Sequence, residues 1–194
     1  NVPLVSLDAI TATAQMSENT AGAFTYTGSS SLLNLKIAGV TVLNASPAPN
    51  TVISLGPIGK VILNEQIVHP VIHSFIVNAI HIHIANLLGY SGDIYLGQTR
   101  TYIASSTSRL QASAFELSAQ AAVSSTHVSI GRQNLLSMKC TGTNGVEADQ
   151  SGVGLQVPGL ATVNALQSVV NGNQTPVGGA FATATAQVAN LSIL

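Results

Sequence analysis

Residues 4–14 read LVSLDAITATA, a stretch in which apolar side chains alternate with small polar ones. Alternation with a period of two is typical of a β-strand that buries one face, because successive side chains of a strand point to opposite sides. The pattern predicts that Val5, Leu7 and Ala9 share the buried face and that the residues between them face solvent. The start of the chain therefore predicts a sheet with a single core face.

The same pattern returns along the chain, broken by the Gly, Pro and Asn residues that are typical of turns. Within residues 29–43, SSSLLNLKIAGVTVL, we expect Leu33, Leu35 and Ile37 on one face and a turn or bulge at Gly39. Further strands are predicted at residues 52–55, 60–63, 71–84, 92–104, 109–122, 127–130, 153–157, 162–170 and 180–194, with a loop at 141–154 and a turn at 171–173.

About a dozen strands between Gly and Pro turns, without a long capped helix, are typical of a sandwich or a jelly roll. The sequence therefore predicts an all-β fold, an antiparallel β-sandwich of jelly-roll-like architecture. We expect residues 1–194 to form a single β-rich domain, which can be divided into two halves at residues 1–104 and 105–194.

The composition excludes several classes of partner. Charged residues make up 7% of the chain, against roughly 25% in an ordinary soluble domain. Six Lys and Arg residues cannot build the basic face that a phosphate backbone requires, so we expect no nucleic-acid partner. The most apolar stretch, residues 67–88, contains four histidines, a proline and two asparagines, so we expect no transmembrane segment. A surface with so little charge favours association between copies of the chain.

Both ends of the chain read as apolar, extended segments that stop without a turn. A strand that stops in this way leaves backbone donors and acceptors open, and a neighbouring subunit can cover them by adding a strand of its own. The residues that we expect in these subunit-interface strands are Leu4, Val5, Leu7, Val188, Leu191 and Ile193.

Several phrases of the sequence together resemble a known family. VSLDAITATA, GSSSLLNLKIAG, APNTVISLGPIGKVILNEQ, VNAIHIHI and GDIYLG follow one another as in the Gram-positive choice-of-anchor P surface proteins, and ASAFELSAQAAVSS and ATATAQVANLSIL are similar to another part of that family. The resemblance implies a β-rich, non-enzymatic protein that is secreted or displayed on the cell surface. In the family the second group of phrases normally precedes the first, so the order is swapped here. A circular permutation and a repeat array both account for the swap.

Two histidines are candidate metal ligands. His81 and His83 are two residues apart in a predicted strand and therefore on one face, where His73 and Asp93 can approach them. Two imidazoles at this spacing can chelate a metal, and a zinc site requires a third ligand. The alternative is that both imidazoles are half-exposed residues on the polar face of the strand. We assign no metal or other cofactor to the chain.

No catalytic residue is predicted, because no serine lies in a G-x-S-x-G motif and no carboxylates show the local spacing of an acid–base pair. The single cysteine, Cys140, is interpreted as a small buried residue or as half of a bridge between subunits. Asn44, Asn173 and Asn190 lie in N-x-S/T sequons and are glycosylation candidates.

Two functions remain open at this point. The first is a structural subunit of a self-assembling extracellular filament or surface layer, in which copies of the chain polymerise head to tail by β-strand addition and contact other cell-surface components. The alternative is an adhesion or glycan-binding module of a longer wall-attached protein. Exposed tyrosines would stack on sugars in that module, whereas core packing is the simpler role for Tyr26, Tyr90, Tyr95 and Tyr102.

Overall fold

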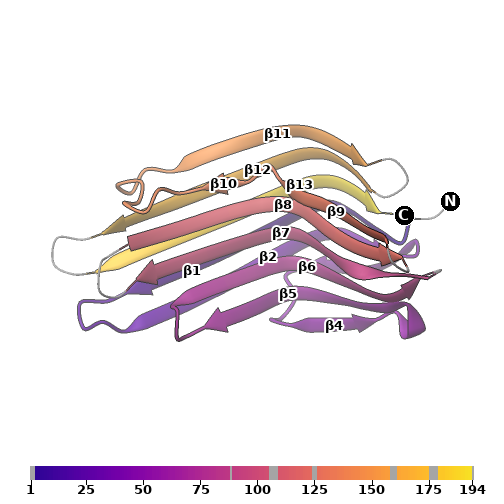
Figure 1. The fold of residues 1–194 in the computed structure, drawn as a ribbon, viewed down its shortest axis with the longest axis horizontal. Helices are drawn as coiled ribbons and strands as arrows, with labels where there is room; N and C mark the ends of the chain where they lie inside the picture. The colour runs from indigo at the N-terminus through magenta and orange to yellow at the C-terminus, as the bar shows by residue number, and fades with distance from the viewer. Residues whose placement is uncertain are drawn as a thin grey trace.

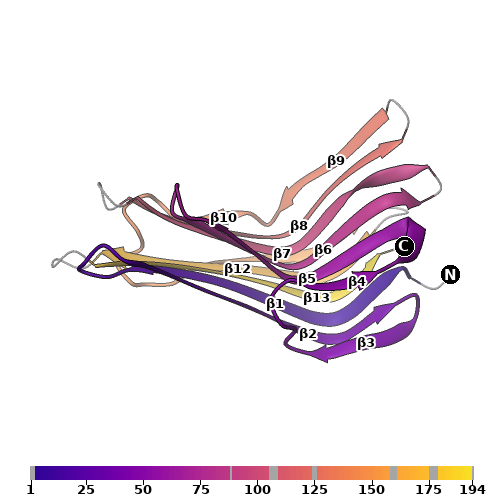
Figure 2. The same cartoon turned by 90° about the horizontal axis from the view of Figure 1, so that it is seen from below.

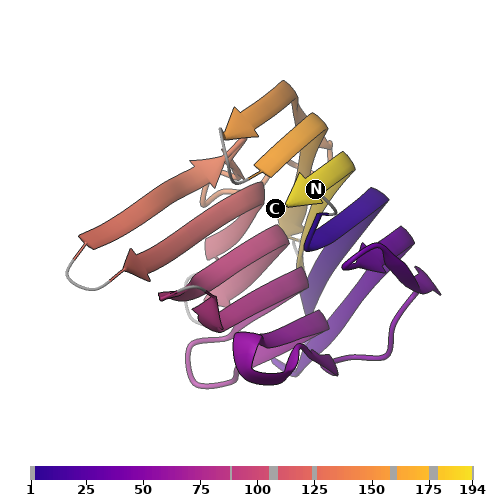
Figure 3. The same ribbon diagram turned by 90° about the vertical axis from the view of Figure 1, so that its right-hand side faces the viewer.

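The computed structural model describes residues 3–87, 89–104, 109–123, 126–157, 161–174 and 179–193. These residues form two antiparallel sheets that pack face to face, as Figures 1 and 3 show. The predicted all-β antiparallel sandwich is confirmed. The part of the chain that the structure describes contains no helix with the length and apolar character needed to span a bilayer.

Sheet A has six strands and sheet B has seven. The strands of sheet A, in spatial order, are β11 (Ala148–Val157), β12 (Ala161–Gln174), β13 (Ala180–Ile193), β1 (Val5–Glu18), β2 (Phe24–Ile37) and β3 (Val40–Ala45). The strands of sheet B are β10 (Leu136–Ser137), β8 (Arg109–Val123), β7 (Tyr90–Ala104), β6 (Ser74–Leu87), β5 (Gly59–His69) and β4 (Thr51–Ser54), with β9 (Thr126–Gln133) also paired to β8. A short 3-10 turn, η1 (Gly56–Ile58), joins β4 to β5.

The first and the last described strands are neighbours in the middle of sheet A. Val5 pairs with Ile193, and the antiparallel pairing continues to Glu18 and Ala180. Figure 3 shows β1 and β13 side by side. Strand β1 also pairs with β2, and β13 also pairs with β12, so both strands have neighbours on both edges. The open strand ends that the sequence predicted are therefore absent from the described residues, and this prediction is wrong.

The inner faces of the sheets form a core of aliphatic and small side chains. At one end of the strands this core is largely alanine, since Ala12, Ala14, Ala182, Ala184 and Ala186 are all fully buried. Small side chains permit close packing because they fill the space between two sheets without forcing unfavourable rotamers. The other end carries the larger aliphatic residues of β5, β6 and β7. Both halves of the chain contribute strands to both sheets, so they share one sandwich.

A row of irregular positions crosses each sheet. In sheet A, Leu7 pairs with Leu191 and Ala9 with Ala189, so Asp8 and Asn190 stand opposite each other at a position that the regular ladder skips. Asn34 continues this row in β2, and both Asn34 and Asn190 adopt positive φ angles, of 54° and 51°. We call this the sheet A bend row.

Sheet B has an equivalent row, which we call the sheet B bend row. It contains Asn64 in β5, with φ of 49°, and Gly97 in β7, with φ of 59°. The ladder between β6 and β7 skips the position of Ala79 and Gly97. Figure 2 shows that the two sheets bend together, and the bend opens toward the outer face of sheet B.

The bend rows shift the phase of the alternation. In β1 the buried face runs through Val5 and Leu7 and then continues at Ile10, so Ala9 does not share it as predicted. In β2 Leu35 and Ile37 are buried as predicted, but Leu33 is 46% exposed. In β2 the left-handed residue Asn34 rotates the chain out of the regular pleat, so the side chains beyond it change sides. In β1 the change occurs at Asp8, which lies opposite Asn34 and Asn190 in the same row.

Three other local predictions are wrong. Residues 171–173 lie inside β12, where they pair with residues 181–183 of β13, and they do not form a turn. Residues 148–154 belong to β11, so the predicted loop at 141–154 ends earlier. Residues 71–73 form a turn that precedes β6.

Candidate functional site

The outer face of sheet B carries a connected group of polar side chains. Ile80 and Ile82 of β6 are buried against the core, so His81 and His83 point to the opposite, outer side of the sheet. On β7 the register places Asp93 opposite His83. The sequence prediction that Asp93 approaches these two histidines is confirmed.

His81 lies at the centre of the group. Its Nδ1 is 3.0 Å from Oε2 of Glu65, and its Nε2 is 2.9 Å from Oδ1 of Asp93. The same oxygen of Asp93 is 2.8 Å from Nδ1 of His83. An imidazole that donates hydrogen bonds from both nitrogens is protonated, so His81 forms a cation between two carboxylates. Glu65, His81, His83 and Asp93 are called the His81 cluster below.

The pKa values of the cluster follow from this arrangement. Burial alone lowers the pKa of His81, but the hydrogen bonds and negative charges of Glu65 and Asp93 outweigh it and raise that pKa above its ordinary value. Burial alone raises the pKa of Glu65 and of Asp93, and the bonds from histidine outweigh it and lower both. The charged form of each group is thus favoured by its partners.

Two amides and a tyrosine extend the cluster. Asn78 donates from Nδ2 to Oε2 of Glu65 at 2.6 Å, and Gln98 donates from Nε2 to Oδ1 of Asn78 at 2.6 Å. The ring of Tyr95 stacks on His81 with 4.4 Å between centroids and 24° between planes. Burial and the nearby negative charges of Asp93 and Glu65 raise the pKa of Tyr95. The result is a pre-arranged surface with an aromatic ring among hydrogen-bonding groups.

The third histidine of the predicted metal site lies elsewhere. His73 precedes β6 and stacks on Phe24, with 3.9 Å between ring centroids. His73 lies eight positions before His81 along the chain, which corresponds to roughly 25 Å of extended strand. Among the described residues, no group of three or more His, Cys, Asp or Glu side chains is arranged to hold a metal ion. The structure therefore does not bring His73, His81 and His83 together.

Two hollows flank the His81 cluster on the outer face of sheet B. One, of about 240 Å³, is lined by Asp93, Gln120, His127 and Ser129 together with residues 91, 92 and 122. The other, of about 340 Å³, lies toward β9 and β10 and begins at Gln98. The polar surface therefore continues along β7 in both directions from Tyr95.

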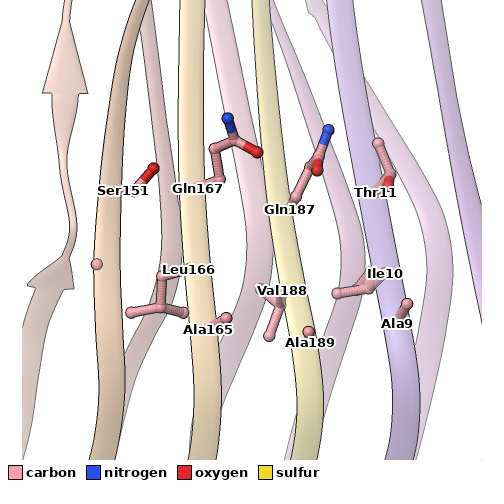
Figure 4. A pocket seen from close by; sticks show the side chains of 11 residues that line it. Ala9, Ile10, Thr11, Ser151, Ala165, Leu166, Gln167, Gln187, Val188 and Ala189 are labelled. Atoms are coloured by element: carbon pink, nitrogen blue, oxygen red, sulfur yellow. The ribbon is translucent and has the colours of Figure 1, made fainter.

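The outer face of sheet A carries a different kind of hollow, whose described lining residues are all uncharged. A shallow hollow of about 300 Å³ crosses β11, β12, β13 and β1 next to the sheet A bend row. Figure 4 shows a polar row and a row of alanines across these strands, with Leu166, Val188 and Ile10 between them. The rows are Ser151, Gln167, Gln187 and Thr11, and Ala165, Ala189 and Ala9.

One carboxyl group is buried between the sheets. Glu116 has no exposed surface, and its Oε1 accepts a 2.6 Å hydrogen bond from Oγ of Ser168. Its Oε2 has no hydrogen-bond partner among the described residues. Burial raises the pKa of Glu116 to about 7, although the bond from Ser168 acts in the opposite direction.

The predicted subunit-interface residues lie inside the sandwich. Val5, Leu7, Val188, Leu191 and Ile193 are all at least 97% buried, and Leu4 packs against the same core. Their strands are paired on both sides within the chain, so the structure does not present them to a partner. The prediction failed because β1 and β13 form backbone hydrogen bonds with each other within the chain.

The remaining candidates have different environments. Asn190 is exposed in the bend row of β13, Asn173 is half-buried near the end of β12, and Asn44 lies in β3 with its side chain outside the described structure. Cys140 is exposed, so its interpretation as a buried residue is wrong. Among the tyrosines, Tyr26 contacts Phe75 at the core with 5.9 Å between ring centroids.

The sequence did not identify Glu65, Asn78 or Gln98 as parts of the site. Each of them lies on a different strand, and their contacts depend on the register of β5, β6 and β7 across the sheet B bend row. The available signal was the phrase LNEQ, residues 63–66, in which a carboxylate and two amides come directly after an apolar residue within β5.

Comparison with known proteins adds no identity to this geometry. No protein-family model matches the chain, and no match was found among curated proteins or among solved structures.

Proposed function

We propose that the protein is a cell-surface adhesion module that binds carbohydrate on the outer face of sheet B. The observation that carries this proposal is the His81 cluster with Tyr95, an aromatic ring held among carboxylate, imidazole and amide groups. Sugars present hydroxyl groups to such polar side chains and a C–H face to an aromatic ring.

The shape of this face suits an extended ligand. Polar or aromatic side chains on the outer face of β7 run from Asp93 to Tyr102, which is roughly 30 Å along a strand. The bend of the two sheets opens toward this side (Figure 2). A shallow, open surface of this length accommodates several units of a polysaccharide better than it encloses a small substrate.

The proposal is tested with an array of soluble glycans and with affinity gels of neutral and acidic polysaccharides. We expect Tyr95→Ala to weaken binding at least tenfold, because it removes the ring on which a sugar stacks. Tyr90→Ala is the matched control, since Tyr90 is exposed on the same strand outside the cluster. Binding that is unchanged in Tyr95→Ala, or absent from every glycan tested, would contradict the proposal.

The filament function has one specific observation in its favour, and we keep it as a second candidate. Sheet A ends in two edge strands, β11 and β3, and each carries an exposed valine: Val153 is 92% and Val40 is 68% exposed. Exposed apolar edge strands favour pairing with another chain. Growth would then join β11 of one copy to β3 of the next, and β1 and β13 would remain within their own chain.

Negative-stain microscopy distinguishes this second candidate. We expect fibres that disappear in Val153→Lys, because a charged residue on an edge strand opposes pairing. Val71→Lys is the control, since Val71 is 90% exposed in a turn outside both sheets. Discrete particles in the unmodified protein at high concentration would rule out the filament.

A further inference from the structure

The second hollow on the outer face of sheet B gathers positive charge. It has a volume of about 340 Å³ and lies where β7 and β8 meet β9 and β10. Arg100 of β7 and Arg132 of β9 both line it, and these are two of only six Lys and Arg residues in the chain. None of the described residues that line it is Asp or Glu. We call it the arginine hollow.

Neither arginine is neutralised within the described part of the chain. The ion pairs found there all belong to the His81 cluster, so no carboxylate lies within 4.0 Å of either guanidinium. Both side chains are exposed. An unpaired guanidinium carries five N–H donors in a planar fork that matches a carboxylate or a sulfate.

Both guanidiniums are held in place without using most of these donors. Arg100 donates from Nε to Oγ of the buried Ser74 at 3.0 Å, and this contact leaves its two terminal nitrogens available. The guanidinium of Arg132 lies 5.2 Å from the centre of the Phe115 ring, which is itself nearly buried. A cation held over an aromatic face keeps its N–H groups free for an anion.

The rest of the lining suits a sugar. Gln98, Tyr102 and Gln111 supply amide and hydroxyl groups, and Ile76 and Met138 supply an apolar surface. Gln98 also donates to Asn78, so the arginine hollow is continuous with the His81 cluster. The His81 cluster and the arginine hollow differ in charge, because the cluster contains two carboxylates and the hollow contains two guanidiniums.

We propose that the arginine hollow binds the anionic group of an acidic sugar residue, a uronic acid carboxylate or a sugar sulfate. The proposal rests on the carbohydrate-binding function proposed above and names its substrate class as an acidic polysaccharide. The anion lies between Arg100 and Arg132, and neighbouring neutral sugar units extend along β7 toward Tyr95.

The test compares polygalacturonate and dextran sulfate with their uncharged counterparts, methyl-esterified polygalacturonate and dextran, by affinity gel electrophoresis and calorimetry. We expect Arg100→Gln and Arg132→Gln each to weaken binding of an acidic polymer roughly tenfold, as the loss of one charge-assisted contact predicts. The carboxylate and sulfate arms show which anion the hollow prefers. Arg109→Gln is the matched control, because Arg109 is exposed on β8 and outside the hollow.

The outcomes separate this inference from the function on which it rests. If charged and uncharged polymers bind equally and still depend on Tyr95, the inference is wrong and the carbohydrate-binding function stands. If Arg109→Gln weakens binding as much as the other two variants, the attraction is general and the inference is also wrong. If no polymer binds, titration with galacturonate and with methyl sulfate, followed by the NMR signals of the arginine Nε–H groups, tests the hollow directly. Shifts confined to Arg100 and Arg132 support anion binding, and unshifted signals overturn it.

Discussion

Nε2 of His81 lies 2.9 Å from Oδ1 of Asp93, across the pairing of β6 with β7. The pKa of His81 is raised, since the bonds to Glu65 and Asp93 outweigh the effect of burial. A basic group whose pKa is higher in the folded chain than in the unfolded chain stabilises the fold. This stabilisation is complete at pH values below the pKa of the unfolded chain, and it is lost as the pH rises through the pKa of the folded chain. Glu65 and Asp93 have lowered pKa values, so their ionised forms stabilise the fold at higher pH. This stabilisation is lost as the pH falls through the pKa values of the folded chain.

The cluster therefore predicts a pH-dependent loss in the variant His81→Gln. We expect this variant to lower the free energy of unfolding by about 1 kcal/mol at pH 6, where the imidazolium is present, and by less at pH 9. Urea unfolding at the two pH values measures the difference. His69→Gln is the control, because His69 is exposed at the end of β5 outside the cluster. An equal loss at both pH values would contradict the charged role of His81.

The buried carboxyl of Glu116 predicts a second pH effect. The pKa of this carboxyl is about 7 in the folded chain, above its ordinary value of 4.5, so the unfolded chain loses this proton first as the pH rises. Stability therefore falls between pH 4.5 and pH 7, by up to about 3 kcal/mol. We expect Glu116→Gln to flatten this part of the stability profile and to raise the midpoint of urea unfolding at pH 8. The exposed Glu147→Gln should leave the profile unchanged, and a profile of unaltered slope in Glu116→Gln would refute the prediction.

Gly97 predicts a cost for any side chain in the sheet B bend row. Its φ is 59°, and an added Cβ would lie 3.3 Å from Cβ of Ala79 and 3.7 Å from Cβ of Ala12 in the other sheet. We expect Gly97→Ala to lower the free energy of unfolding by about 1–2 kcal/mol, because a non-glycine residue is strained there and its neighbours are already packed. Gly131→Ala, whose Cβ would meet nothing within 4 Å, is the control. Equal midpoints of thermal unfolding for both variants would disprove this role of the row.

The pairing of β1 with β13 predicts that the order of the strands can be permuted. Residues 193 and 5 are partners, so a short linker can join the two strands as a hairpin. We expect a permuted chain that carries this linker and opens between β3 and β4 to keep the far-UV circular dichroism of the original and to unfold cooperatively. Deletion of residues 186–193 should instead abolish cooperative unfolding, because it removes Val188, Leu191 and Ile193 from the core. A cooperatively folded deletion variant would be inconsistent with the central place of β13.

The alternation of apolar and polar residues was sufficient to predict the class of fold and most of the strands. It also placed His81 and His83 on one face, because that inference needs only the period of a strand. The phase shift at Ala9 and Leu33 could not be predicted in the same way. Asn34 and Asn190 read as ordinary polar residues of a strand, and their left-handed backbone becomes evident only when the strands are aligned with one another.

The role of the chain ends could not be predicted for a related reason. An apolar strand that is not followed by a turn has no pairing partner next to it in the sequence. The local sequence is the same whether that partner is a strand of another molecule or a distant strand of the same chain. The partnership of β1 with β13 is a contact between residues more than 160 positions apart, which local patterns do not encode. The same applies to Glu65, whose bond to His81 crosses between two strands.

The bend rows also determine how the strands align. In a strand such as FATATAQ, residues 181–187, a slip of two residues would place nearly the same side chains against the core, so the alternation by itself specifies the alignment weakly. A left-handed residue interrupts this otherwise repetitive pattern. In a slipped strand, this irregular residue would no longer lie beside the irregular positions of the neighbouring strands. The strand register is thus specified by four left-handed residues, Asn34, Asn190, Asn64 and Gly97. They select one register from several that the pattern of apolar residues alone would allow.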